Sequence, residues 1–196
     1  MADKRFLAAC LGALALSGCI SLGEKPPPVL LTLTSASTVA AGTERSAAAG
    51  SAVTVVVPNV PQALQTLRVP VKATATSIAY IKNAQWVEQP NKLFQRLLSE
   101  TIAARTGRVV LDPRQSTLDP GTRLTGTLQS FGLDAASGEA TVVYDAEIAR
   151  NNGATVDTRR FEAKAPASAR PQSVAAALNT AANQVAVEVA DWVGDR

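Results

Sequence analysis

Two stretches of the chain carry apolar residues at helical spacing, which predicts two amphipathic helices. The first, over residues 91–106, has its apolar side chains three or four positions apart, at Leu93, Phe94, Leu97, Leu98 and Ile102. Pro90 suits its first turn, and Gly107 stands where a helix commonly ends. The second, over residues 171–193, ends at Gly194 and repeats at Val174, Leu178, Ala181, Val185, Val189 and Trp192.

Eight further segments have the composition or the alternation of β-strands. They are rich in Val, Leu, Ile and Thr and bounded by turn residues, at 29–34, 52–58, 67–71, 77–81, 108–111, 122–133, 140–150 and 155–165. The alternation is clearest in 140–150, where every second side chain suits a core, at Val142, Tyr144, Ala146 and Ile148. This pattern predicts a strand with one face packed and the other in solvent.

The segment 122–133 changes its alternation part-way along. Leu124 and Leu128 fall on one parity, whereas Phe131 and Leu133 fall on the other. One extra residue in a strand would reconcile the two halves. We therefore expect a β-bulge near Gln129 and Ser130.

The order of strands, helix, antiparallel strands and helix predicts an α+β fold, a mainly antiparallel sheet with two long helices packed on one face. Residues 35–52 are almost entirely Ala, Ser, Thr and Gly, too poor in large apolar groups to pack, so we expect a mobile loop there. The length suits a single folded domain, which we place at 29–196.

The N-terminus has the features of a bacterial lipoprotein signal. Lys4 and Arg5 precede the apolar segment 6–16, which is too short to span a bilayer, and small residues lead to Cys19. We expect residues 1–18 to be a signal peptide and Cys19 to become the lipidated first residue. An ordinary cleaved signal that contains cysteine, or a core helix, is the alternative.

The segment 19–28 then forms a Pro-rich tether, with Pro26, Pro27 and Pro28 predicting a stiff, extended chain. Several acyl chains on one cysteine exceed what stable membrane attachment needs. Ile20 stands where retention at the inner membrane often requires Asp. We therefore expect anchoring in the outer membrane, with the domain in the periplasm.

Composition argues against enzymatic and nucleic-acid functions. The chain has no histidine, and its cysteines are Cys10, within the signal, and Cys19. Histidine-based triads, thiolate nucleophiles and His-ligated zinc are therefore ruled out of the mature protein. The net charge of +3 is spread along the chain, which does not suit nucleic acid. We expect no catalytic residue, no metal and no cofactor.

Three aromatic residues are candidates for a partner surface, Tyr80, Trp86 and Trp192. The alternative for each indole is the core, because a buried Trp contributes several kcal/mol. Asp145 and Glu147 share one strand face, which suits either acid–base chemistry or a solvated surface.

The lipobox-like start, the two helices and the long hairpin strands together resemble the ABC-type transport auxiliary lipoproteins, a family with PqiC-like intermembrane transport members. The most similar motif is the helix start Trp86-Val87-Glu88-Gln89-Pro90, with Val87 where the family has Ala. Leu64-Gln65-Thr66-Leu67-Arg68 departs from the family's Leu-Asp-Arg-like segment.

The resemblance implies a non-enzymatic lipoprotein that connects an ABC transporter and an MCE-domain protein to the outer membrane during lipid transport between the two membranes. It also implies assembly into a homo-oligomeric ring. The alternative function is that of a structural envelope lipoprotein, a chaperone or plug for another outer-membrane assembly protein.

Overall fold

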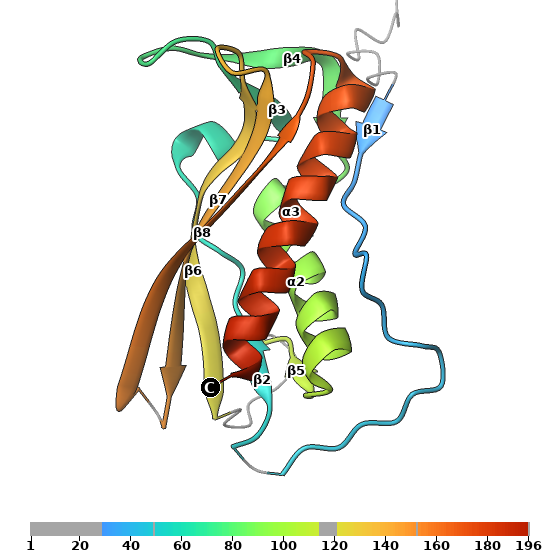
Figure 1. Cartoon of the computed structure of the whole chain (residues 1–196), viewed down its shortest axis with the longest axis vertical. Helices are drawn as coiled ribbons and strands as arrows, with labels where there is room; N and C mark the ends of the chain where they lie inside the picture. The colour runs from blue at the N-terminus through green and yellow to red at the C-terminus, as the bar shows by residue number, and fades with distance from the viewer. Residues whose placement is uncertain (1–28, 49, 114–120, 152, 196) are drawn as a thin grey trace, which may run out of the picture.

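The computed structural model describes residues 29–48, 50–113, 121–151 and 153–195, which form one mixed sheet with two helices on one face (Figure 1). The predicted signal peptide, Cys19 and the Pro-rich tether lie outside the described residues. The strands are β1 (Val29–Leu31), β2 (Val53–Val55), β3 (Arg68–Lys72), β4 (Ile78–Trp86), β5 (Val110–Leu111), β6 (Thr122–Asp134), β7 (Glu139–Arg150) and β8 (Thr155–Pro166). The helices are η1 (Gln62–Leu64), α2 (Pro90–Thr106) and α3 (Pro171–Gly194).

The sheet is built around the antiparallel meander β6–β7–β8, and its predicted α+β class is confirmed. The other edge of β6 is shared, because β2 pairs with its first half and β3 with its last residues, both in parallel. Beyond them, β5 joins β2 in parallel, β4 joins β3 antiparallel, and β1 joins β4 in parallel. The short parallel pairings were not predicted, since they join segments far apart in the chain.

The predicted bulge in β6 is confirmed. The pairing of β6 with β7 shifts by one residue between Leu128 and Ser130, which leaves Gln129 as the extra residue. Leu128 and Phe131 therefore both point to the helical side and are buried. Without this shift, the second half of the strand would turn its apolar side chains to solvent.

Strand β4 is longer than its predicted segment, 77–81, and runs on to Trp86. Trp86 is 0% exposed and its ring lies 5.3 Å from that of Phe131. Phe94 of α2 continues this cluster, with its ring 5.3 Å from that of Tyr144 on β7. The aromatic cluster therefore joins the sheet to the first helix at the centre of the core.

Both helices begin and end close to their predicted positions. α2 starts at Pro90, and Gly107 caps its end with a φ of 70°, a left-handed conformation that glycine adopts readily. α3 buries Val174, Leu178 and the rest of its predicted stripe against β7 and β8. Within the described residues, no helix is both long and apolar enough to cross a membrane.

The segment 35–52 forms no helix or strand in its described part. Its first residues nevertheless run along the two helices and make hydrogen bonds to them. The mobility expected of this segment stays a prediction.

Replacing Trp86 tests the aromatic cluster. We expect Trp86→Ala to lower the free energy of unfolding by about 3–5 kcal/mol, as large-to-small changes of buried aromatics do. Trp86→Phe should cost less than half of that, because it keeps a ring against Phe131 and the indole N–H has no acceptor among the described residues. Val87→Ala, at a half-exposed neighbour, is the control, with a change within about 0.5 kcal/mol. Urea unfolding measures all three, and equal midpoints would contradict the cluster's role.

Candidate functional site: a groove on the open face of the sheet

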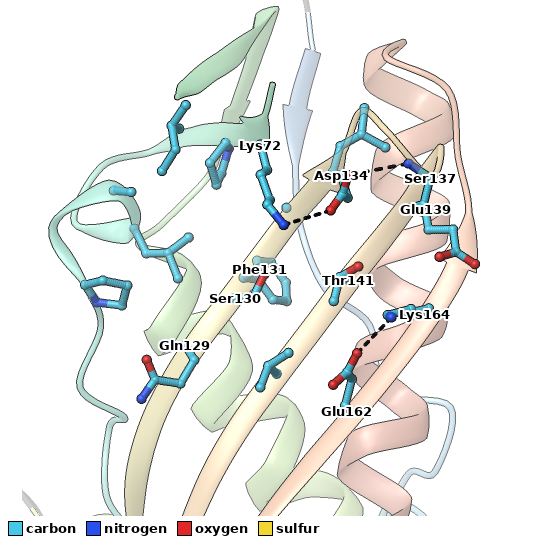
Figure 2. A pocket seen from close by; sticks show the side chains of 18 residues that line it. Lys72, Gln129, Ser130, Phe131, Asp134, Ser137, Glu139, Thr141, Glu162 and Lys164 are labelled. Carbon is cyan, nitrogen blue, oxygen red and sulfur yellow. Dashed lines mark hydrogen bonds and ion pairs between the residues drawn. The ribbon is translucent and has the colours of Figure 1, made fainter. Parts of the chain in front are cut away.

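A groove of about 600 Å³ lies on the face of the sheet that the helices leave open (Figure 2). Its floor is made by outward side chains of β6, β7 and β8, among them Ser130, Thr141 and Glu162. Its wall is made by η1 and the start of β4, which contribute Leu64 and Ile78. The groove therefore lies between the meander β6–β7–β8 and the segment that holds η1 and the start of β4.

The bulge and a glycine shape this groove. Gln129, the extra residue of the bulge, points to the open face together with Ser130. Gly132 lets β3 come close, because a Cβ at this position would lie 2.4 Å from the Pro70 carbonyl oxygen. A side chain at Gly132 would push the wall away from the floor.

Two ion pairs line the groove, as Figure 2 shows, one between β3 and β6 and one within β8. Lys72 Nζ lies 3.3 Å from Asp134 Oδ2, and Lys164 Nζ lies 3.0 Å from Glu162 Oε1. The pKa of Asp134 is lowered, chiefly by the backbone N–H of Ala136 and then by Lys72. The pKa of Lys164 is raised by its hydrogen bond to Glu162. Glu139 also lines the groove, so its lining holds three carboxylate and two ammonium side chains.

The wall of the groove is apolar. Leu64, Pro70 and Ile78 line it, and Val143 adds an aliphatic side chain on the floor. Ile78 is 56% exposed, an unusual exposure for a large aliphatic residue in a strand. Apolar surface beside charged side chains suits non-covalent binding of an amphipathic segment or ligand.

Tyr80 lies directly behind this wall. Its hydroxyl donates a hydrogen bond of 3.4 Å to the carbonyl oxygen of Ala63, which itself lines the groove. The Arg68 guanidinium stands 4.2 Å from the centre of the Tyr80 ring, a cation–π contact. The predicted partner residue Tyr80 is thus half-buried and linked to the groove.

The other two predicted partner residues lie inside the domain. Trp86 is 0% exposed, and Trp192 is 5% exposed with its ring 5.6 Å from that of Phe161. These positions match the alternative that each indole packs in the core. Of the three residues, only Tyr80 has an accessible ring for a partner.

Of the paired carboxylates, Asp145 is held in an ion pair with Arg160. Asp145 accepts hydrogen bonds from Arg160 at 2.5 and 2.7 Å and from Gln129 at 3.0 Å. These bonds, those of Arg160 first, lower its pKa. A carboxylate that acts as a base near neutral pH needs a raised pKa instead. In the described part of the chain, no group of three or more His, Cys, Asp or Glu residues could hold a metal ion.

Tyr144 is a buried tyrosine of β7 whose pKa is also shifted. The Tyr144 hydroxyl donates a hydrogen bond of 2.8 Å to the carbonyl oxygen of Thr125. Burial raises the pKa of Tyr144 far above its usual value. Its hydroxyl therefore stays protonated and acts as a structural donor.

Sequence reasoning did not find the groove. Its wall comes from η1 and the first residues of β4, which no periodicity links to the meander. The one available signal was the extra residue of the bulge, which turns Gln129 and Ser130 to the open face.

Comparison with solved structures supports the fold. A crystal structure of a Xanthomonas campestris protein is similar with a TM-score of 0.69 and 18% identity, covering 85% of this chain and 95% of that one. A second structure, of an uncharacterized protein, has a TM-score of 0.62 and 14% identity over 76% and 96% of the two chains. A PelC dodecamer from Paraburkholderia phytofirmans has a TM-score of 0.40 and 13% identity, covering 74% and 93%. No curated relative matches the sequence.

Comparison with protein families gives a match over nearly the whole described domain. Residues 31–190 match the family described as the ABC-type transport auxiliary lipoprotein component. This range runs from β1 to the last turns of α3 and includes the groove, Tyr80 and both helices. The chain therefore belongs to the ABC-type transport auxiliary lipoprotein family.

Proposed function

We propose that this protein is a non-enzymatic, lipid-anchored component of an ABC-transporter and MCE-type system that moves lipids between the inner and outer membranes. The observation that carries the proposal is the family match over residues 31–190. The lipobox-like sequence before Cys19 supports the anchor. The ion-paired state of Asp145 supports a binding role rather than acid–base chemistry.

The groove and its wall are the proposed contact surface for the transport partners. Ile78, on the wall of the groove, is 56% exposed, and its aliphatic side chain is open to a partner. An exposed apolar side chain on the wall of a groove suits a protein interface. Tyr80 with its stacked Arg68 lies within the same region and can contribute the aromatic and cationic groups common at interfaces.

We also propose that copies of the chain form a ring through β8. Among the described strands, β8 pairs only with β7, so its other edge is open along Thr155–Pro166. Unpaired backbone groups on a long edge are a template for another strand. Two-fold antiparallel pairing of β8 edges would point the two N-terminal ends in opposite directions. In a head-to-tail ring, the open edge of β8 meets a different surface of the next copy. Such a ring keeps every anchor on one membrane.

Replacing Cys19 tests the anchor. We expect Cys19→Ala to move the protein from the outer-membrane fraction to the soluble periplasmic fraction, because no acyl chain can then be attached. Cys10→Ala, within the segment that processing should remove, is the matched control and should leave the distribution unchanged. Membrane fractionation on a density gradient gives the readout. Equal membrane amounts for Cys19→Ala and wild type would refute the lipid anchor.

A charge placed in the groove tests the partner surface. We expect Ile78→Asp to reduce at least tenfold the recovery of an MCE-domain protein or ABC-transporter subunit with the purified lipoprotein, because it desolvates a charge against the partner. Thr180→Asp is the control, since it places the same charge on an exposed residue of α3, outside the groove and outside β8. Quantitative mass spectrometry after mild cross-linking measures the recovery. Recovery of unrelated outer-membrane assembly proteins instead would favour the alternative function.

A proline on the open edge of β8 tests the ring. The Ala167 N–H donates to the Gly138 carbonyl oxygen, so odd-numbered residues of β8 turn their backbone toward β7 and even-numbered ones turn it outward. Thr158→Pro should therefore spare the monomer's fold but remove an outward N–H. We expect a multimer of more than two subunits for wild type and Thr158→Ala, and a monomer for Thr158→Pro, by light scattering. A wild-type monomer at all concentrations would exclude the ring.

A further inference from the structure

A strap of residues 32–39 follows β1 and runs extended along the helical layer (Figure 1). Its side chains alternate between exposed and half-buried, as in a strand, and Ser35, Ser37 and Val39 face the helices. No described strand pairs with it. Its backbone groups are bound by side chains of the helices instead.

Two asparagines of α3 hold the backbone of the strap. The Thr34 N–H donates to Asn179 Oδ1 at 2.8 Å, and the Ala36 N–H donates to Asn183 Oδ1 at 2.7 Å. The Asn183 amide also donates to the Thr34 carbonyl oxygen at 2.9 Å, so this side chain pairs with the strap as a neighbouring strand would. A bond of 2.8 Å from Asn183 to the Asn179 carbonyl oxygen fixes its orientation.

Helix α2 adds two contacts. The Val39 N–H donates to Glu100 Oε1 at 3.1 Å, and the hydroxyls of Ser35 and Thr101 lie 3.0 Å apart. These contacts extend the hydrogen bonding of the strap to Val39, its last residue. The strap is therefore held by polar bonds from both helices.

The strap buries little apolar surface. Leu33 and Val39 are only half-buried, and the side chains of Thr34, Ala36 and Thr38 are exposed. Segments with few buried apolar contacts open more readily than core strands. The hydrogen bonds to Asn179 and Asn183 thus carry a large share of what keeps the strap in place.

Strand β1, on the N-terminal side of the strap, is a weak attachment by itself. It has three residues and pairs along one edge, with β4. Leu31 is its buried side chain among those described. A pull on the N-terminus would reach β1 first and the strap second.

We propose that Asn179 and Asn183 form a stop that sets the length of the membrane tether, an inference that rests on the proposed lipid anchor at Cys19. With β1 and the strap in place, residues 19–28 separate the anchor from the sheet, and ten residues span at most about 35 Å. With both released, the free chain is residues 19–52, which spans at most about 120 Å. The tether is therefore short when the two asparagines bind the strap and long when the strap and β1 are released.

The change in reach alters which partners the domain can meet. A short tether keeps the groove near the membrane that holds the anchor, whereas a long tether lets the same domain approach a partner deeper in the periplasm. Tether length sets the effective concentration at each distance without any new contact. A partner that binds only the extended form would hold the strap open.

The first experiment measures the stop without the membrane. Hydrogen exchange of the full-length purified protein should show amides of residues 32–39 exchanging at least tenfold faster in Asn179→Leu/Asn183→Leu than in wild type. Thr180→Ala/Gln184→Ala, on the exposed side of the same helix, should match wild type. Asn179→Asp keeps the acceptor that Thr34 uses and should keep protection. The loss expected in Asn179→Leu/Asn183→Leu, whose side chains are of similar size, is what a purely steric role would not predict. Unchanged exchange in Asn179→Leu/Asn183→Leu would overturn the stop.

The second experiment measures reach. A dye on an engineered Ala75→Cys, in the exposed turn between β3 and β4, reports the distance of the domain from vesicles that carry the lipidated protein and acceptor dyes on the lipid headgroups. Transfer should be lower in Asn179→Leu/Asn183→Leu than in wild type or Thr180→Ala/Gln184→Ala. Equal transfer in all three would overturn the proposed length switch. If wild type does not stay on the vesicles, the anchor fails, while the exchange experiment still decides the stop.

Discussion

The β-bulge at Gln129 is the constraint on which the two faces of the sheet depend. Because one extra residue resets the alternation of β6, both Leu124 and Leu133 stay beneath the helices and the meander keeps a single apolar face. A one-residue slip would turn half of the strand over. The same residue turns polar groups to the open face, where the groove forms. Core and candidate site therefore follow from one local irregularity.

The sequence predicted the elements well where periodicity is long and local. The α2 boundaries followed from Pro90, Gly107 and a regular apolar stripe, and the bulge followed from the parity change between Leu128 and Phe131. The parallel pairings of β1, β2 and β3 could not be predicted, because each spans a few residues and joins distant segments. The extension of β4 to Trp86 was also missed, since Asn83, at a φ of 56°, interrupts its alternation.

The candidate site was less accessible to sequence reasoning than the core. Aromatic content pointed to Trp86 and Trp192, and both indoles pack inside the domain. The more informative residues were Ile78 and Lys72, which no pattern marks, because their role depends on η1 folding over the meander. Pairing also decides the chemistry of the charged groups. Asp145 is paired with Arg160, and Lys72 is paired with Asp134. Paired charges of this kind suit binding of a partner by shape and polarity.

The most weakly held part of the fold is the part nearest the proposed membrane anchor. The meander is held by long antiparallel pairings, whereas the N-terminal arm is held by three strand residues and side-chain bonds from α2 and α3. A tethered protein benefits from this order, because force on the anchor meets a region whose opening leaves the core intact. Asparagine suits the stop, since one amide both donates to and accepts from an extended backbone. Because these hydrogen bonds are made to the backbone, the strap does not need particular side chains, and most of its residues are small or polar.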